Sequence, residues 1–420
     1  MSLPSTTPTG VDADLRARAA RVIPGGMWGH QRAAVVPPGF PQFFKGGQGA
    51  RVMDANGRSY IDFMCAWGPM ILGHSHPAPL AAALGQLQAG DSLNGPTGHL
   101  VELSELMVET IPHADWALFQ KNGSDATTAC VVIARAATGK RKVLVARGAY
   151  HGATPWCSPS IIGITAEDRA HMVHYDYNDI ASLDAALASC GDDVAAIFVS
   201  AFKHDYYKTQ HSPTPAFARA VRAHCDRLGA ALVVDDVRAG FRLNLGGSWE
   251  EVGVRADLSA WSKAIANGFP LAAVTGGERF REAASKIFVT GSFWYGGAPM
   301  AAAVATIREL HRIDGPKLMK QAGERFRDGL LEQAARHGFG LEISGPAAMP
   351  MMIFAGDTPQ ATLGARFCLE ALERGVYLSP MHNMFLSTAH DDAVIDEALE
   401  ATEAAFAAVA RDRKAEGATA

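Results

Sequence analysis

The chain has 420 residues, of which 48% are apolar and 19% charged, and its formal net charge is −5 at pH 7. This composition supplies enough apolar material for a large buried core and excludes a disordered chain. The acidic balance, without a long basic run, argues against a nucleic-acid-binding surface.

The N-terminal stretch MSLPSTTPTGVDADLRARAARVIPGG lacks an apolar segment, so we expect no secretory signal peptide. The apolar runs elsewhere, such as 194–202, are far shorter than a membrane span. The cysteines never occur as Cys-x-x-Cys, which argues against a structural zinc site, and they are too sparse for a disulfide scaffold. We therefore expect a cytoplasmic protein with reduced thiols that binds neither a metal nor a membrane.

The middle of the chain alternates strand-like and helix-like segments. A helix is predicted over about 125–137, after the loop KNGSDA, and another over 215–229, with Pro at its start and Gly at its end. Brief apolar runs without polar alternation are typical of strands buried on both faces, and they cover 142–146, 195–199, 230–234 and 271–275. This pattern predicts an α/β domain whose sheet is parallel or mostly parallel.

The pattern changes after residue 299. Amphipathic helices are predicted over 300–313 and 321–337, strands over 351–354 and 376–378, and a helix near 391–410, followed by a frayed tail. We therefore expect a large α/β domain over 56–299 and a smaller α+β domain over 300–420, which the N-terminal segment 1–55 joins.

Three familiar fingerprints are missing. The sequence has no G-x-G-x-x-G after a strand, no G-x-x-x-x-G-K-[ST] and no G-x-S-x-G. Their absence weighs against a Rossmann dehydrogenase, a P-loop NTPase and an α/β-hydrolase.

Two charged residues follow predicted buried strands. Asp235 ends the run ALVVD, at the sheet edge where α/β proteins bind ligands, although a lone aspartate there also suits a helix N-cap. Lys263 follows the strand-like run 257–262, and a lone lysine is more often a surface residue. As a pair, they match the needs of pyridoxal phosphate, which takes a lysine on its aldehyde and a carboxylate on its pyridinium nitrogen.

The loop KNGSDA and the motif YHG supply further candidates. Gly123 and Ser124 stand at a predicted helix start, where N–H groups bind phosphate, although an ordinary capping loop has the same composition. Tyr150 follows the strand 142–146 and has the aromatic face that a pyridine ring needs, although a core aromatic residue fits as well.

With these residues, the chain resembles the class III, fold-type I pyridoxal-phosphate aminotransferases, the family that includes glutamate-1-semialdehyde aminomutase. The resemblance extends over nearly the whole chain through the motifs VIPGG, AWGP, LGHSHP, NGSDA, YHG, VDDVRAGFR and WSK. Within the family, VIPGGMWGH, KNGSDAT, VTGSFW and HNMFLS are most similar to bacterial fumonisin-type amine aminotransferases. Those enzymes deaminate a long-chain amino polyol with pyruvate as acceptor.

The resemblance implies a role for each matching residue. Lys263 forms the Schiff base, Asp235 holds the pyridinium N–H, and Gly123 and Ser124 hold the phosphate. Tyr150 and Val237 cover the two ring faces. The family also implies a homodimer with shared active sites, in which Thr290 or Ser292 contacts the partner's phosphate; an apparent insertion leaves the choice open.

Two residues depart from the family pattern, and two histidines match it. Asp236 replaces the family's Glu and Ser262 its usual Gly, and neither change removes a catalytic group. His74 and His76 are interpreted as structural because no metal-ligand set accompanies them.

Four further residues are candidates for substrate contacts. Arg32 matches a carboxylate-binding arginine of the aminomutase branch, with a surface arginine as the alternative. Candidate pocket walls for an apolar amine are Trp67, Trp294 and Tyr295, with core packing as the alternative.

The implied activity is a ping-pong transamination between a primary amine and a keto acid such as pyruvate. An aminomutase or racemase on the same cofactor is the main alternative, which an assay for a released keto product distinguishes. A non-catalytic binding protein would lack bound coloured cofactor, and a nicotinamide oxidoreductase would bind its own cofactor in a titration.

Overall fold

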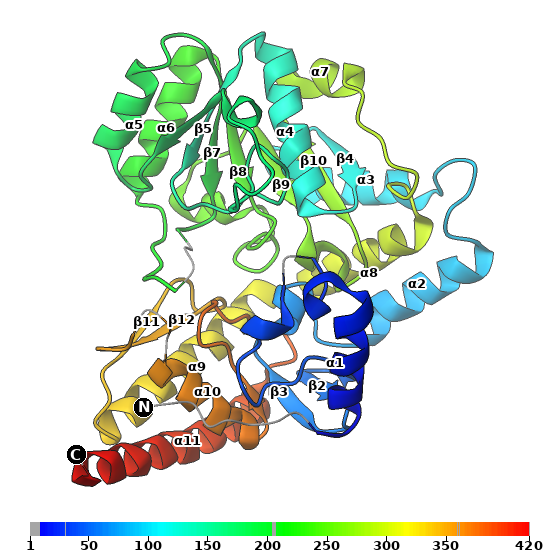
Figure 1. Cartoon of the computed structure of the whole chain (residues 1–420). Helices are drawn as coiled ribbons and strands as arrows, with labels where there is room; N and C mark the ends of the chain where they lie inside the picture. The colour runs from blue at the N-terminus through cyan, green and yellow to red at the C-terminus, as the bar shows by residue number, and fades with distance from the viewer. Residues whose placement is uncertain (1–8, 30, 204–206, 359, 361, 420) are drawn as a thin grey trace.

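The computed structural model describes residues 9–29, 31–203, 207–358, 360 and 362–419 (Figure 1). Residues 1–8, part of the stretch read for a signal peptide, lie outside the described residues. The α-helices are α1 Gly10–Val22, α2 Pro77–Ala89, α3 His99–Thr110, α4 Gly123–Thr138, α5 Ile180–Ala188, α6 Pro215–Leu228, α7 Arg281–Lys286, α8 Gly297–Ile313, α9 Gly315–Arg336, α10 Thr362–Glu373 and α11 Asp392–Thr419. The strands are β1 Phe44–Gln48, β2 Arg51–Asp54, β3 Ser59–Asp62, β4 Trp116–Gln120, β5 Lys142–Ala146, β6 Met172–Tyr175, β7 Val194–Ser200, β8 Ala231–Asp235, β9 Leu258–Trp261, β10 Ala272–Gly276, β11 Leu341–Ser344, β12 Met351–Phe354 and β13 Val376–Tyr377.

A seven-stranded sheet forms the upper part of the molecule, in the order β4-β10-β9-β8-β7-β5-β6 (Figure 1). β6, β5, β7, β8 and β9 pair in parallel, whereas β10 is antiparallel to both of its neighbours, β9 and β4. Every residue of β7 and of β8 is buried, as expected for strands covered on both faces. The prediction of an α/β fold with a mostly parallel sheet is therefore confirmed.

Helices cover both faces of this sheet. On one face, α5 and α6 pack on alternate strand residues such as Leu144 and Ile197. On the other face, α4 and α7 pack on the residues between them, such as Val143 and Phe198. The alternation follows from the two-residue period of a strand. Helix α6 begins as predicted, with Thr214 accepting a hydrogen bond from the Phe217 amide and Pro215 in the first turn.

The lower part contains the four-stranded sheet β1-β2-β3-β13, the hairpin β11-β12 and the helices α9, α10 and α11 (Figure 1). Strand β13 pairs in parallel with β3, so residues 376–377 and 61–62 lie side by side although they are far apart in the chain. A large apolar core extends from this part along α8 to the base of the upper sheet. The C-terminal part of the chain thus joins the sheet formed by the N-terminal strands, after the larger sheet between them.

Two predictions for the C-terminal third differ from the structure. The helix predicted over 321–337 begins earlier, because α9 starts at Gly315 directly after the left-handed residue Asp314. The tail predicted to fray continues α11 to Thr419. Its sequence RDRKAEGATA contains helix-forming Ala, Arg, Lys and Glu, which the prediction underweighted.

Among the described residues, none of the helices combines the length and apolar character that crossing a bilayer requires.

Candidate active site

The two charged residues singled out in the sequence lie at the same edge of the upper sheet. Strand β8 ends at Asp235, which stands opposite Ala260 in the parallel ladder with β9. The chain then leaves β9 at Trp261 and reaches Lys263 two residues later. Carboxyl ends of parallel strands form the ligand-binding edge of α/β sheets. The sheet register therefore brings Asp235 and Lys263 to that edge together.

Asp235 is buried and held by two hydrogen bonds. One oxygen accepts from the Val237 amide at 3.1 Å, and the other lies 2.7 Å from Nδ1 of His151. His151 is 2% exposed, and its Nε2 has no hydrogen-bond partner among the described residues. A neutral ring with its proton on Nδ1 donates to the carboxylate and leaves a bare Nε2. These two contacts fix the orientation of the carboxylate.

Sequence reasoning missed His151 as a site residue. It stands in the YHG motif beside Tyr150, yet a histidine in a loop is no sign of a contact with a strand 84 positions away. Its carbonyl accepts a hydrogen bond from the Thr127 hydroxyl at 2.6 Å, which fastens the loop to α4. The motif itself, at the carboxyl end of β5, was the signal that could have identified it.

Lys263 has the properties of a reactive amine. It is partly exposed, takes a left-handed φ of +45°, and makes no hydrogen bond or ion pair with any described residue. Burial lowers its pKa to about 8, Arg238 and Arg242 lower it further, and Asp235 opposes them. Non-glycine residues with positive φ cluster at functional sites, because the surrounding structure must hold them there. Lys263 therefore reaches the neutral form that attacks an aldehyde at a lower pH than an ordinary lysine does.

The start of α4 forms a tight cradle beside these residues. Asn122 and Asp125 cap the helix through reciprocal hydrogen bonds, so the backbone enters the helix at Gly123. A Cβ on Gly123 would lie 2.6 Å from Val237 Cγ1, and one on Gly152 would lie 2.6 Å from Ser124 Oγ. Neither glycine can be replaced without displacing its neighbour. Helix N-termini bind phosphate through such exposed N–H groups.

The residues predicted to cover a ring lie around this cradle. Val237 packs against Gly123, as the close approach of its methyl group shows. Tyr150 is 41% exposed, and burial of the rest of the ring raises the pKa of its hydroxyl. Its charge interactions with Arg238 and Asp235 place it near both. A large aromatic residue with one open face at this position can stack on a bound ring.

A strained turn borders Lys263 on another side. Cys65, Ala66 and Trp67 have consecutive positive φ angles of 47°, 53° and 68°. Each left-handed non-glycine residue costs about 1 kcal/mol or more. Asp62 compensates by accepting hydrogen bonds from the amides of Met64 and Cys65, at 2.8 and 3.1 Å.

The turn ends at Gly68, which lies against the aliphatic part of Lys263. A Cβ on Gly68 would lie 3.4 Å from Lys263 Cδ. The carbonyl of Gly68 also accepts a hydrogen bond from the buried Arg242 guanidinium. The strained turn therefore shapes the wall next to the reactive amine.

The loop before α11 packs against the same strained turn. The His382 ring packs edge-on against Trp67, with ring centroids 5.1 Å apart. Burial, with Arg238 and Lys263 nearby, lowers the His382 pKa to about 3, so the ring is neutral at physiological pH. Asn383 accepts a hydrogen bond from Arg238 at 2.7 Å. Trp67 thus lies beside His382, and its role as a pocket wall stays a prediction, whereas Arg238, His382 and Asn383 were not predicted.

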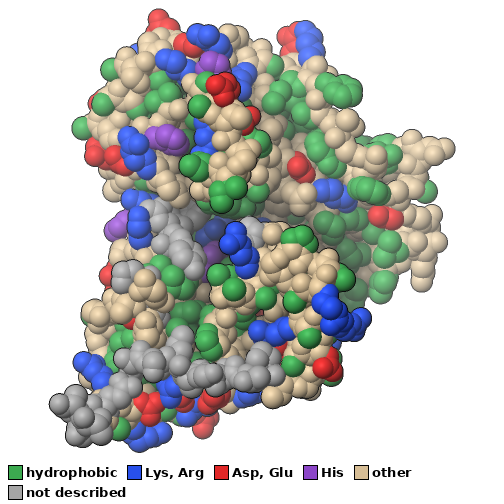
Figure 2. All heavy atoms as spheres, viewed as in Figure 1, with side chains coloured by type: hydrophobic (Ala, Val, Ile, Leu, Met, Phe, Trp, Pro, Cys, Tyr) green, Lys and Arg blue, Asp and Glu red, His purple; other side chains and the backbone are tan. Residues whose placement is uncertain are grey.

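Charged and histidine side chains gather where the upper and lower parts of the molecule meet (Figure 2). Arg238 and Lys263 come from the upper part, and His382 and Asn383 from the loop that precedes α11. The site is therefore built between the two sheets rather than within either.

Four predicted residues are not brought to Lys263 by a described contact. Arg32 caps the 3-10 helix Ala33–Val35 and packs near Gly25. Thr290 and Ser292 lie on the exposed segment before α8, and Trp294 folds back onto Gly291 in the same segment.

The paired histidines of LGHSHP have structural contacts. His74 Nε2 lies 2.8 Å from Asp62, the residue that supports the strained turn. His76 accepts a hydrogen bond from the Ala78 amide at the start of α2, and lies 3.9 Å from Glu309. Within the part of the chain that the structure describes, no cluster of three or more metal-ligating side chains occurs.

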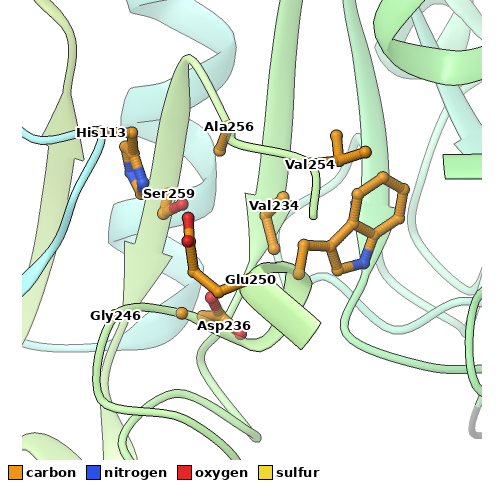
Figure 3. A pocket seen from close by; sticks show the side chains of 10 residues that line it. His113, Val234, Asp236, Gly246, Glu250, Val254, Ala256 and Ser259 are labelled. Atoms are coloured by element: carbon orange, nitrogen blue, oxygen red, sulfur yellow. The ribbon is translucent and has the colours of Figure 1, made fainter. Parts of the chain in front are cut away.

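Asp236 faces away from the site, because successive strand residues point to opposite sides. It accepts a hydrogen bond from the Ser248 amide at 3.1 Å and lines a cavity of about 10 Å³ with His113, Glu250 and Ser259 (Figure 3). Such a volume holds about one water molecule. Burial raises the Asp236 pKa to about 7, and the nearby Asp235 charge adds to this effect. Asp235 is thus the main anion at this strand end.

Comparison with known proteins places the chain in a defined group. The family model for class III aminotransferases matches residues 34–409. The chain is 48% identical over 399 residues to the aminopentol aminotransferase of Sphingopyxis macrogoltabida, covering 95% of this chain and 94% of that protein. It is 32% identical over 396 residues to the 3-aminobutyryl-CoA aminotransferase of Cloacimonas acidaminovorans (strain Evry), covering 93% and 95%.

A solved structure gives the same result. The FumI protein of Sphingopyxis sp. MTA144, in its PLP internal aldimine form, superposes with a TM-score of 0.94 and 48% sequence identity. The match covers 96% of this chain and 97% of that one. The fold and the length of the described chain therefore agree with an enzyme solved with this cofactor.

Proposed function

The chain belongs to the class III aminotransferase family, and from this premise we propose that it transfers the amino group of a long-chain amino polyol of fumonisin type to pyruvate. The coarser activity, pyridoxal-phosphate-dependent transamination of an amine with a keto acid, follows from the family itself. The finer substrate rests on the 48% identity to an aminopentol aminotransferase over most of both chains. The observation that carries the function is the placement of Lys263 and Asp235 at one sheet edge.

The residues at this edge fit pyridoxal phosphate. The cradle at Gly123 and Ser124 excludes side chains and opens onto the start of a helix, as a phosphate requires. The Lys263 amine has no hydrogen-bond or ion-pair partner among the described residues and has a lowered pKa, which suits capture of an aldehyde. Asp235 is buried and oriented, which suits a protonated ring nitrogen. These observations support the assignment of Gly123, Ser124, Asp235 and Lys263 as cofactor residues.

The proposed mechanism divides the work among these side chains. When bound, pyridoxal phosphate supplies an aldehyde that takes up the amino group and a ring that accepts electrons from the substrate carbon. Lys263 Nζ would act as general base and acid, moving the proton from the substrate carbon. Asp235, oriented by His151, would hold the ring N–H. Tyr150 and Val237 would contact the two faces of the ring.

We also propose that the enzyme works as a homodimer with shared active sites. Leu80, Leu84 and Leu87 form an exposed apolar stripe on α2, at helical spacing. Their exposed fractions of 37%, 51% and 47% are those of a surface that a second copy would cover. Thr290 and Ser292 are also exposed, which leaves either of them available for the proposed contact with the partner's phosphate.

Two broader expectations accompany this proposal. We keep the division into a segment 1–55, a large domain 56–299 and a small domain 300–420 as a proposal, noting that β3 and β13 share a sheet. A cytoplasmic location is proposed on the reduced cysteines, five of which are buried.

An aminomutase or racemase would retain the amino group on its product, whereas a transaminase releases a ketone. The test is a panel of amine donors, including a long-chain amino polyol and short amines, run in parallel with pyruvate and 2-oxoglutarate. We expect a keto product with the amino polyol and pyruvate. If no donor gives a keto product while an amino acid substrate is isomerised, the proposal is wrong.

Variants link the activity to the site. Lys263→Ala should abolish both turnover and the visible absorbance of the bound cofactor. Lys286→Ala is the matched control, because Lys286 is exposed on α7 and pairs only locally with Glu282. A Lys263→Ala protein that kept turnover would overturn the assignment.

A further inference from the structure

His151 and Ser200 each carry a buried polar atom without a partner. Nε2 of His151 and Oγ of Ser200 are both sealed from solvent, and neither makes a hydrogen bond within the described part of the chain. Both residues are 2% exposed. Buried polar groups in folded proteins are nearly always hydrogen-bonded to protein or to ordered water, because an unmade bond leaves the loss of solvation uncompensated. Each of these two atoms therefore requires an explanation.

The sheet register places Ser200 beside Asp235. Ser200 ends β7 and pairs with Asp235, which ends β8, in the parallel ladder. Side chains alternate along a strand, so Ser200 points to the same face as Phe198. For the same reason Asp235 shares the face of Val233. Phe198 and Val233 belong to the apolar cluster beneath α4, so Ser200 and Asp235 are neighbours on the face that α4 covers.

His151 lies over the same face of the sheet. Its ring contacts the Phe198 ring edge-on, with centroids 5.4 Å apart. Its Nδ1 lies 2.7 Å from an Asp235 oxygen, on the neighbouring strand. The ring therefore extends from β7 to β8 near the level at which Ser200 and Asp235 stand opposite each other. The two atoms without partners thus belong to one small region.

The aromatic neighbours of His151 cannot serve its open ring nitrogen. Trp156 stacks nearly parallel to the His151 ring, with centroids 6.4 Å apart, and its indole N–H already donates to the Thr128 hydroxyl at 3.0 Å. Phe198 has no polar atom. The Ser200 hydroxyl is the unused donor that the sheet register brings to this ring.

The backbone of Ser200 is fixed by its carbonyl. This carbonyl accepts hydrogen bonds from the Tyr177 hydroxyl at 2.9 Å and from the Trp249 indole at 3.1 Å. The hydroxyl can rotate, but the backbone that carries it is held in place. Because Ser200 Oγ and His151 Nε2 are not hydrogen-bonded directly, one bridging water is the smallest link between them.

We propose that Ser200 is a positioning residue, whose hydroxyl holds one buried water against Nε2 of His151. The water donates a hydrogen bond to Nε2, so the ring keeps its proton on Nδ1, from which it donates to Asp235. The opposite tautomer would place two acceptors, Nδ1 and the carboxylate, against each other. The inference rests on the proposed function, because the cofactor's ring nitrogen gives Asp235 its task. It extends the support of Asp235 from one residue to a chain of three groups.

The test compares Ser200→Thr with Ser200→Val in the holoenzyme. Both variants add the same methyl group and suit a strand, and Ser200→Thr alone keeps the hydroxyl. In protein labelled with ¹⁵N in histidine, the His151 signals are identified by their loss in His151→Gln. We expect Ser200→Thr to keep the wild-type signals, with one protonated and one bare nitrogen. Ser200→Val should shift the Nε2 signal and populate the second tautomer.

The kinetic readout separates positioning from substrate binding. Relative to Ser200→Thr, Ser200→Val should lower kcat about fivefold, the effect of one lost hydrogen bond, and should keep KM for the amine and for pyruvate. If the added methyl group prevents folding, Ser200→Ala, which adds no volume, is compared with the wild type by the same measurements. The inference is overturned if removal of the hydroxyl changes neither the His151 signals nor kcat.

Ser259 supplies the matched control. It is 1% exposed, its Oγ also lacks a partner among the described residues, and it lines the Asp236 cavity on the opposite face of the sheet. Ser259→Val should therefore leave the His151 signals unchanged, and a shift as large as that of Ser200→Val would also overturn the inference. The nuclear magnetic resonance measurement needs no turnover, so failure of the proposed function would not hide this result.

Discussion

Lys263 should destabilise the cofactor-free protein near neutral pH. Its pKa is lowered from 10.5 to about 8, so below pH 8 the folded state carries a desolvated charge that the unfolded chain carries in water. The difference corresponds to at most about 3 kcal/mol of unfolding free energy. Lys263→Met keeps the shape of the side chain and removes the charge, and Lys263 has no hydrogen bond to lose.

The sign of the pH dependence follows from proton linkage. Between pH 8 and 10.5 the unfolded state binds more protons at this residue than the folded state, so wild-type stability rises with pH in that window. The gain from Lys263→Met should therefore be full at pH 7 and vanish toward pH 10.5. For a chain of 420 residues, it amounts to a rise in Tm of roughly 3 °C at pH 7.

The assay is urea and thermal unfolding of the cofactor-free protein at pH 7 and pH 9.5, followed by tryptophan fluorescence. Lys286→Met is the control, because the Lys286 and Glu282 side chains are 70% and 80% exposed and their pair contributes little. A Lys263→Met protein no more stable than the wild type at pH 7, or one whose advantage does not shrink at pH 9.5, would refute the reasoning.

Two further predictions concern the cofactor cradle and the Asp235 contact. Gly123→Ala should weaken pyridoxal phosphate binding by about tenfold or more, because its Cβ would meet Val237 at 2.6 Å. Adding Val237→Ala to the same protein should restore part of the lost affinity. A cofactor titration followed by absorbance measures both affinities, and an unchanged affinity in the single variant would contradict the geometry. His151→Phe should lower kcat by about tenfold or more while the cofactor still binds, because Asp235 loses its hydrogen-bond partner at 2.7 Å. His151→Gln should retain more activity, because an amide can still donate a hydrogen bond. Equal kcat values for the two variants would show that the hydrogen bond has no role.

Much of the central sheet follows from local sequence. The runs 195–199 and 230–234 are apolar throughout, and 142–146 is apolar after Lys142. They form the strands β5, β7 and β8 within one residue. Pro215 and Gly229 delimit α6, because proline suits a first helical turn and glycine a left-handed end. Asp235 and Lys263 could also be identified, since each directly follows such a strand.

The local sequence does not predict whether a buried strand runs parallel or antiparallel to its neighbours. The run at 271–275 matched a buried parallel strand, and β10 is buried, but it runs antiparallel to β9 and β4. Burial on both faces gives the same apolar pattern in either direction, so chain connections decide it. The left-handed turn at Cys65–Trp67 was hidden for a related reason: Asp62 and Arg242 stabilise a conformation that those three residues disfavour by themselves.

The sequence by itself determined the type of fold and singled out Lys263 and Asp235 as candidates, because both follow from short-range patterns of burial and charge. The tertiary structure alone decided what surrounds them. His151 reaches Asp235 from another loop, and Asn383 reaches Arg238 from 145 positions away. Such contacts depend on how distant segments pack, and no periodicity within either segment encodes the distance between them.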